Sequence, residues 1–263
     1  MSGEDYGQTD EARRTRAGIA CAEAEVAFAA GDLDAAAAGY RVAGDEYRAL
    51  CDGWALANCL HQFGVVCQYQ GDYAGAEPLL QESLALAMQL GDAEAQARTL
   101  HQLGRSRLQA GDYAGADAVY ARSLSIKTEL GDRAAMASTL HQMGMLRRLQ
   151  GNLTEAAEFY GLSLVINRRL EDWPGIGGTL AELGRLRLLE GDNLSALADS
   201  WQALSIFHGT SRPEAASAAI TILDVRRRID APAFAEAAAH AGITREVVEQ
   251  VEDALSQHPT PAQ

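Results

Sequence analysis

The stretch LHQLG at Leu100–Gly104 recurs in this chain at a spacing of 40 residues. LHQFG stands at Leu60–Gly64, LHQMG at Leu140–Gly144 and a degraded copy, LAELG, at Leu180–Gly184. A fixed period of this length is typical of proteins in which one supersecondary unit is stacked on copies of itself. The period therefore predicts a repeat architecture.

Each unit has the pattern of two helices joined by a tight turn. Apolar residues follow a helical period from Ala97 to Leu108, which predicts a helix over Ala93–Gln109. Gly111 then marks the turn, and the same reasoning predicts a second helix over Tyr113–Leu130. The unit is therefore a helix hairpin.

A glycine falls in the middle of the first helix of four units. Glycine there costs about 1 kcal/mol relative to alanine, so it needs a packing reason. We expect it to allow the two helix backbones of a hairpin to approach closely. The four positions are Gly64, Gly104, Gly144 and Gly184.

The pattern of large and small residues around these glycines resembles the tetratricopeptide repeat. In one copy the matching positions are Leu103, Gly104, Gly111, Tyr113, Ala116, Tyr120 and Ser123. The period is 40 residues, longer than the usual 34 or so, and Leu-Gly-Asp or Leu-Glu-Asp junctions stand where the family has a proline. Such longer repeats are similar to those of bacterial tetratricopeptide-repeat proteins, kinesin light chains and Pins-type adaptors.

The resemblance implies an all-α fold, a right-handed α-solenoid of antiparallel helix hairpins. We expect a disordered N-terminus at residues 1–9 and about five hairpins plus a half-unit over residues 10–229. Short capping helices are expected over residues 230–258, followed by a disordered tail at residues 259–263.

Composition narrows the classes of function. The formal net charge of −14 repels phosphate backbones, so we expect no nucleic-acid partner. No apolar run is long enough for a membrane span and the N-terminus lacks a signal-peptide pattern, so we expect a cytoplasmic protein with no membrane partner. The four cysteines show no C-x-x-C spacing and are expected to be small buried thiols. No cofactor is implied.

In the family that the chain resembles, the first helix of each hairpin lines a concave groove. Positions spaced along one face of that helix carry a repeated histidine with arginines beside it. The ligand-binding candidates are Asn58, His61, Gln62, Tyr69, Arg98, His101, Gln102, Arg105, His141, Gln142, Met145, Arg148 and Arg185.

These residues favour an adaptor or scaffold that binds a partner protein or peptide. Guanidinium groups form charge-assisted hydrogen bonds with carboxylates, so Arg98, Arg105, Arg148 and Arg185 are candidates to hold an acidic segment or a C-terminal carboxylate. Family relatives with this role imply protein–protein interaction as the general function. Self-association through exposed edge helices stays open.

Three alternatives use the histidines differently. Each imidazole could bridge one hairpin to the next, as a packing feature copied by duplication. The histidines could instead be acid/base groups of an enzyme or line a small-molecule site, although the sequence has no G-x-S-x-G, phosphate-loop or H-E-x-x-H motif. A metal site is disfavoured because His61, His101 and His141 lie on separate hairpins.

Overall fold

The computed structural model describes residues 3–207, 213–246, 248 and 249. The regular structure of these residues consists of twelve α-helices, with no strand. The chain divides into two compact units, Met1–Asp132 with α1 to α6 and Arg133–Gln263 with α7 to α12. We call them unit 1 and unit 2.

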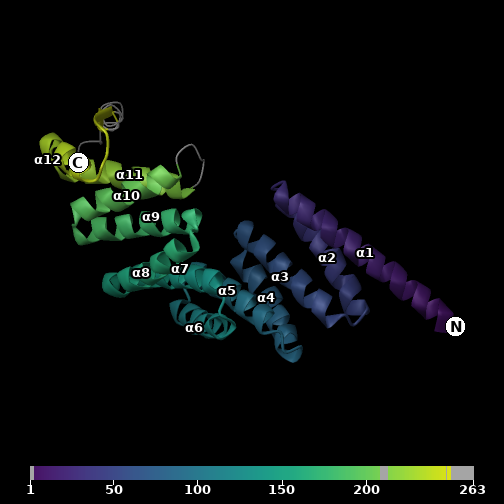
Figure 1. Cartoon of the computed structure of the whole chain (residues 1–263). Coiled ribbons are helices and arrows are strands. Elements are labelled where there is room, and N and C mark those ends of the chain that lie inside the picture. The colour runs from purple at the N-terminus through teal and green to yellow at the C-terminus, as the bar shows by residue number, and fades with distance from the viewer. Residues whose placement is uncertain (1–2, 208–212, 247, 250–263) are drawn as a thin grey trace. The chain divides into compact units, whose positions relative to one another are not determined.

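Unit 1 is a stack of helix hairpins. In each hairpin a first helix packs against the second, and neighbouring hairpins stack through α2 with α3 and α4 with α5 (Figure 1). The first helices α3 and α5 also contact each other. The helices are α1 (Gly3–Ala29), α2 (Leu33–Ala49), α3 (Gly53–Tyr69), α4 (Tyr73–Gln89), α5 (Ala93–Gln109) and α6 (Tyr113–Leu130).

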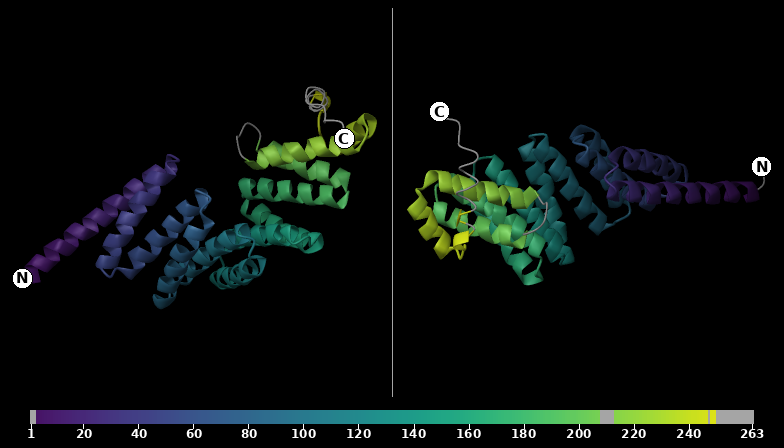
Figure 2. Two further views of the ribbon diagram at one scale, coloured as in Figure 1. Left: turned by 180° about the vertical axis from the view of Figure 1, so that it is seen from behind. Right: turned by 90° about the horizontal axis from the view of Figure 1, so that it is seen from above.

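Unit 2 continues the same hairpin pattern and then departs from it. The helix α11 packs on both α9 and α10, and α12 packs on α10 and α11 (Figure 2). Phe234 of α12 is buried in an apolar cluster with Leu197 and Val225, so α12 covers part of the last hairpin. The helices are α7 (Arg133–Leu149), α8 (Leu153–Leu170), α9 (Trp173–Glu190), α10 (Asn193–Ile206), α11 (Pro213–Arg228) and α12 (Ala231–His240).

Glycine and aspartate fix the junctions between helices. Gly111 and Gly131 have φ angles of 79° and 70°, a left-handed conformation that glycine adopts without a steric penalty. The Asp112 carboxylate caps α6 by accepting a hydrogen bond from the Gly115 backbone N–H at 2.9 Å. These two features end one helix and start the next within two residues, which explains why the hairpins recur so regularly.

The mid-helix glycines make room for side chains of the second helix. A Cβ at Gly104 would overlap the Tyr120 ring, and one at Gly144 would lie 2.7 Å from the Tyr160 ring. At Gly64 the neighbour is the Leu80 side chain. The expectation of backbone approach is therefore wrong at these three positions, because a large buried side chain occupies the space.

The segment boundaries can be compared with the expected ones only in part. The helix α1 begins at Gly3 and so includes most of the stretch at residues 1–9 for which the sequence predicts disorder. The end of α11 at Arg228 lies beside the expected boundary at residue 229. Residues 247 and 250–258 of the stretch expected to form capping helices, and the tail at residues 259–263, lie outside the described residues.

Candidate functional site

A cavity of about 370 Å³ opens in unit 1 beside the N-terminal half of α3. Residues of α1, α2, α3 and α5 form its wall. Trp54 stands at its edge with 63% of its surface exposed. Four residues that the sequence predicts as ligand-binding contribute to the lining, namely Asn58, His61, Gln62 and Arg98.

His61 is held between α3 and α5. It is only 5% exposed, and its Nδ1 lies 3.1 Å from the Thr99 hydroxyl. Burial, with a smaller contribution from the Arg98 charge, lowers the pKa of His61 to about 4. The imidazole is therefore neutral at pH 7 and one of its nitrogens is already engaged.

The same bridge recurs in unit 2. The Nδ1 of His141 lies 3.3 Å from the Thr179 hydroxyl, which joins α7 to α9. Burial lowers the pKa of His141 as well. These two contacts favour the packing interpretation of the repeated histidine, in which each imidazole ties one first helix to the next. His101, from the copy between them, packs its ring against Tyr120 with centroids 5.8 Å apart.

Two of the predicted arginines in unit 1 are bonded to uncharged groups. Arg98 donates to Asn58 Oδ1 at 2.8 Å, and Arg105 donates to Gln102 Oε1 at 3.1 Å. Among the ion pairs of the described residues, neither arginine has a carboxylate partner. Arg98 is exposed and Arg105 is half-buried, so both positive charges are open to an added anion.

The two predicted arginines of unit 2 are differently placed. Arg148 Nε lies 3.3 Å and Arg185 Nη1 lies 3.5 Å from the carboxylate of Glu182. Tyr160 donates its hydroxyl to the same carboxylate at 3.4 Å. Glu182 therefore partly neutralises both guanidinium groups, which distinguishes them from Arg98 and Arg105.

The sequence carried a signal for this difference. The degraded repeat copy LAELG has a glutamate, Glu182, where the other copies have Gln62, Gln102 and Gln142. That single change places a carboxylate on the first helix of the hairpin, where the arginine of the preceding first helix can reach it. The positions of the arginines alone do not indicate this carboxylate.

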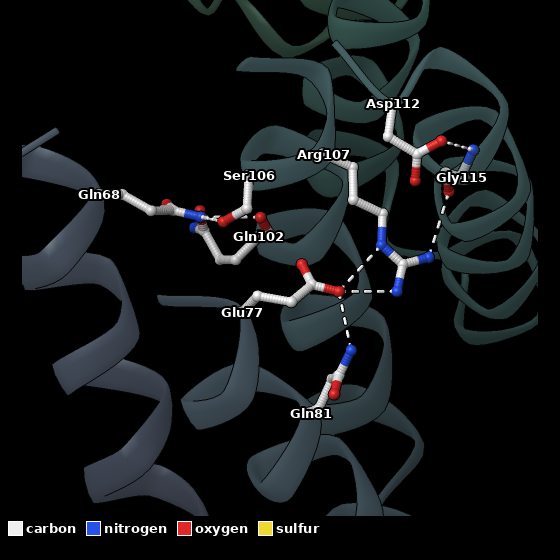
Figure 3. A network of polar contacts seen from close by, with 8 residues as sticks. All are labelled: Gln68, Glu77, Gln81, Gln102, Ser106, Arg107, Asp112 and Gly115. Carbon is white, nitrogen blue, oxygen red and sulfur yellow. Dashed lines mark hydrogen bonds and ion pairs between the residues drawn. The ribbon is translucent and has the colours of Figure 1, made fainter. Parts of the chain in front are cut away.

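A further part of the first-helix face is used for packing (Figure 3). Gln68 is 4% exposed, and its amide nitrogen donates to the Gln102 carbonyl and to Ser106 Oγ, both at 2.8 Å. Next to Ser106 on α5, Arg107 pairs with Glu77 of α4 at 2.8 Å. The buried contacts of Gln68 and the partly buried ion pair of Arg107 fix how α5 packs against its neighbours, so they hold the helix that carries Arg98 and Arg105.

The remaining predicted residues fall into different surroundings. Tyr69 is 61% exposed and its ring packs edge-on against Phe28, with centroids 5.2 Å apart. Gln142 lines a second cavity, of about 300 Å³, in unit 2 together with His141. Met145 packs against the apolar cluster around Tyr160. The structure thus brings Asn58, His61, Gln62 and Arg98 together in unit 1, and the other predicted residues lie elsewhere.

Within residues 3–207, 213–246, 248 and 249, no group of three or more His, Cys, Asp and Glu side chains could hold a metal ion. In the same part of the chain, no helix has the length and apolar character required to cross a bilayer.

The model of the tetratricopeptide repeat matches residues 55–129 of this chain, which run from α3 to α6. Over this stretch the chain has tetratricopeptide repeats. The fold class predicted from the sequence, an all-α solenoid of antiparallel helix hairpins, is thereby confirmed, as is the resemblance to kinesin light chain repeats.

Solved structures of other repeat proteins are similar to this chain. BtubC (BKLC) from P. vanneervenii is 20% identical, with 88% of this chain and 95% of that chain covered and a TM-score of 0.66. A Rap protein complexed with Competence and Sporulation Factor is 11% identical, covering 92% of this chain and 64% of that one, with a TM-score of 0.66. Kinesin light chain TPR-like repeats from Podosopora anserina are 17% identical over 76% of this chain and 92% of theirs, with a TM-score of 0.55.

At sequence identities of 20% or less, the similarity to these three structures shows the fold alone. No curated protein matches the chain by sequence. The match of residues 55–129 to the tetratricopeptide repeat supports a protein-interaction scaffold in general.

Proposed function

We propose that this protein is an interaction scaffold that binds an acidic partner peptide on the first-helix face of unit 1. In this proposal Arg98 and Arg105 hold carboxylates of the peptide, while Asn58 and Gln62 bond its polar groups. The Rap protein that was solved with Competence and Sporulation Factor supports the general idea, because a similar fold there holds a bound factor.

The observation that carries the proposal is the bonding of Arg98. Its guanidinium is fixed by Asn58 at 2.8 Å beside an open cavity, and its charge has no carboxylate partner among the described ion pairs. A protein with a net charge of −14 that keeps such an arginine at a cavity offers a local site for an anion. Each charge-assisted hydrogen bond to a ligand contributes about 1.5–3 kcal/mol.

The neighbouring groups suit a peptide better than a free ion. Trp54 is an exposed aromatic side chain at the cavity edge, and aromatic residues often dominate the binding energy of an interface. Gln62 is exposed on the same wall and can bond a peptide backbone. In this proposal His61 positions α3 against α5 and does not itself bind the ligand.

The test selects a library of peptides with free C-termini for binding to the wild-type protein. The same selection is made against the Arg98→Glu/Arg105→Glu variant. We expect wild type to enrich peptides rich in Asp and Glu, and the variant to bind the selected peptides at least about tenfold more weakly, because two charge-assisted bonds are lost. A matched control is Arg14→Glu/Arg122→Glu, which makes the same change of charge on exposed parts of α1 and α6.

The control decides between a local site and general electrostatics. Equal weakening in both variants would show that only the net charge matters. Unchanged binding in Arg98→Glu/Arg105→Glu would remove these arginines from the site.

The cavity itself favours a second candidate, a small-molecule ligand, because about 370 Å³ lies within the usual range for ligand pockets. An enzyme that uses His61 as its acid or base is not favoured. A general base works best when its pKa is near the working pH, and that of His61 is about 4. A compound that binds wild type and competes with the selected peptides only when Trp54 is intact would support the small-molecule candidate.

A further inference from the structure

A pair of cysteines replaces the histidine–threonine bridge at the first repeat interface. The bridging residues elsewhere are 38 positions apart, in His61 with Thr99 and in His141 with Thr179. The same spacing from Cys21 leads to Cys59. Between α3 and α5 this pair of positions holds an imidazole and a hydroxyl. Between α1 and α3 the same pair of positions holds two thiols.

The two thiols lie close together. Cys21 packs against the cluster of buried residues that contains Cys59, and both side chains line the wall of the cavity in unit 1. When Cys21 ionises, the Cys59 thiol can donate a hydrogen bond to its thiolate. Cys59 is 3% exposed and its Sγ lies 3.2 Å from the Tyr40 carbonyl, to which it donates. Cys21 is half-buried and so can meet a small reagent that enters the cavity. The expectation that all four cysteines are buried is wrong, since Cys51 is exposed.

We propose that Cys21 and Cys59 are a redox-active dithiol, in which Cys21 reacts with a peroxide and Cys59 then closes a disulfide. Cys21 is the nucleophile because it is the accessible member of the pair. Cys59 is the resolving thiol because it is buried against Cys21 and out of reach of the reagent.

The electrostatics of the pair support this division of roles. The hydrogen bond from Cys59 lowers the pKa of Cys21 to about 7, assisted by one from Tyr47 and opposed by burial and by the charge of Glu25. The hydrogen bond to Cys21 and burial raise the pKa of Cys59. A large fraction of Cys21 is therefore thiolate at neutral pH, while Cys59 keeps its proton.

The reaction balances with one equivalent of hydrogen peroxide. The Cys21 thiolate attacks one peroxide oxygen, the O–O bond breaks, and Cys21 becomes a sulfenic acid while hydroxide leaves. Cys59 Sγ then attacks the Cys21 sulfur, its proton goes to the departing hydroxyl group, and water is released. The two sulfurs together give two electrons to the peroxide.

The disulfide would tie α1 to α3 in the wall that also carries Asn58 and Arg98. We expect it to change the affinity of the cavity for the acidic peptide, a consequence that rests on the proposed function. The crosslink itself does not depend on that function.

The test treats the full reduced chain with one equivalent of hydrogen peroxide and maps its cysteines by mass spectrometry of an unreduced digest. We expect a peptide that joins Cys21 to Cys59 and lacks two hydrogens, which returns to two separate peptides on reduction. In Cys59→Ser we expect a sulfenic acid at Cys21 that dimedone traps. In Cys21→Ser we expect no dimedone adduct at Cys59.

Cys51 serves as the control inside the same chain, because it is exposed and lies outside the pair. A digest in which Cys51 is oxidised while Cys21 and Cys59 remain unlinked thiols would overturn the proposal and leave the pair as a packing feature. Circular dichroism of each variant shows that it is folded. If the crosslink forms but the affinity for the peptide stays the same, the dithiol proposal holds and the expected effect of the disulfide on binding is wrong. If no peptide binds the reduced wild-type protein, the proposed function fails instead.

Discussion

Lowering the pH from 7.5 to 5.0 should destabilise unit 1 through His61. Burial lowers its pKa from 6.5 to about 4 in the folded protein, whereas the unfolded chain keeps the ordinary value. The unfolded chain therefore binds a proton more tightly than the folded one. By linkage, the stability falls as the pH drops below 6.5, and the loss is complete below about 4.

The magnitude follows from that difference in pKa. At about 1.36 kcal/mol for each pH unit, the full effect is about 3 kcal/mol. At pH 5.0 the histidine is mostly protonated in the unfolded chain and mostly neutral in the fold, which gives a loss of about 2 kcal/mol. Because the side chain is 5% exposed, solvent screens little of this effect.

The assay compares wild type with His61→Gln, which has no titrating ring at this position. Urea unfolding followed by circular dichroism at pH 7.5 and 5.0 gives the stability, and hydrogen exchange of α3 and α5 amides locates the change in unit 1. We expect His61→Gln to be less stable than wild type at pH 7.5 and to lose about 2 kcal/mol less between the two pH values. His240→Gln, on the exposed side of α12, is the control for the substitution itself.

If wild type and His61→Gln lose the same stability between pH 7.5 and 5.0, the reasoning is refuted. His61 would then not be the buried, neutral bridge to Thr99 that the structure shows.

Two further substitutions test the packing and the capping of the repeat. Gly104→Ala should lower the free energy of unfolding in urea by about 1–3 kcal/mol, because its Cβ would overlap the Tyr120 ring. The control Gly18→Ala, with nothing within 4 Å of the added Cβ, should be neutral or stabilise by up to about 1 kcal/mol. Equal effects of the two substitutions would contradict the close packing. Asp112→Ala should cost about 1 kcal/mol and speed hydrogen exchange in the first turn of α6, because the Gly115 N–H loses its cap; unchanged exchange there would count against the cap.

The sequence predicts the hairpins well because local signals set their ends. The helices expected over Ala93–Gln109 and Tyr113–Leu130 have those bounds in the structure. Glycine with a left-handed backbone and an aspartate cap stop one helix and start the next, and both features are readable from neighbouring residues. Because the unit is repeated, the same signals mark the helix ends in successive hairpins.

The candidate site is less predictable because it depends on contacts between hairpins. Periodicity places His61 on a face of α3, but it does not reveal that Thr99 meets that face, so a ligand group and a packing group have the same pattern. The arginines show the same limit. Arg105 and Arg185 occupy the same position of the repeat, yet only Arg185 meets Glu182.

The most direct test of the central claim is a charge exchange between Arg98 and a carboxylate of a selected peptide. Affinities are measured for wild type and Arg98→Glu, each with the peptide and with its Glu→Lys counterpart, to give a double-mutant cycle. We predict that each single change weakens binding at least about tenfold and that the combination restores most of it, because the ion pair is reversed. Additive losses, with no recovery in the double exchange, would contradict the account that Arg98 holds the partner's carboxylate.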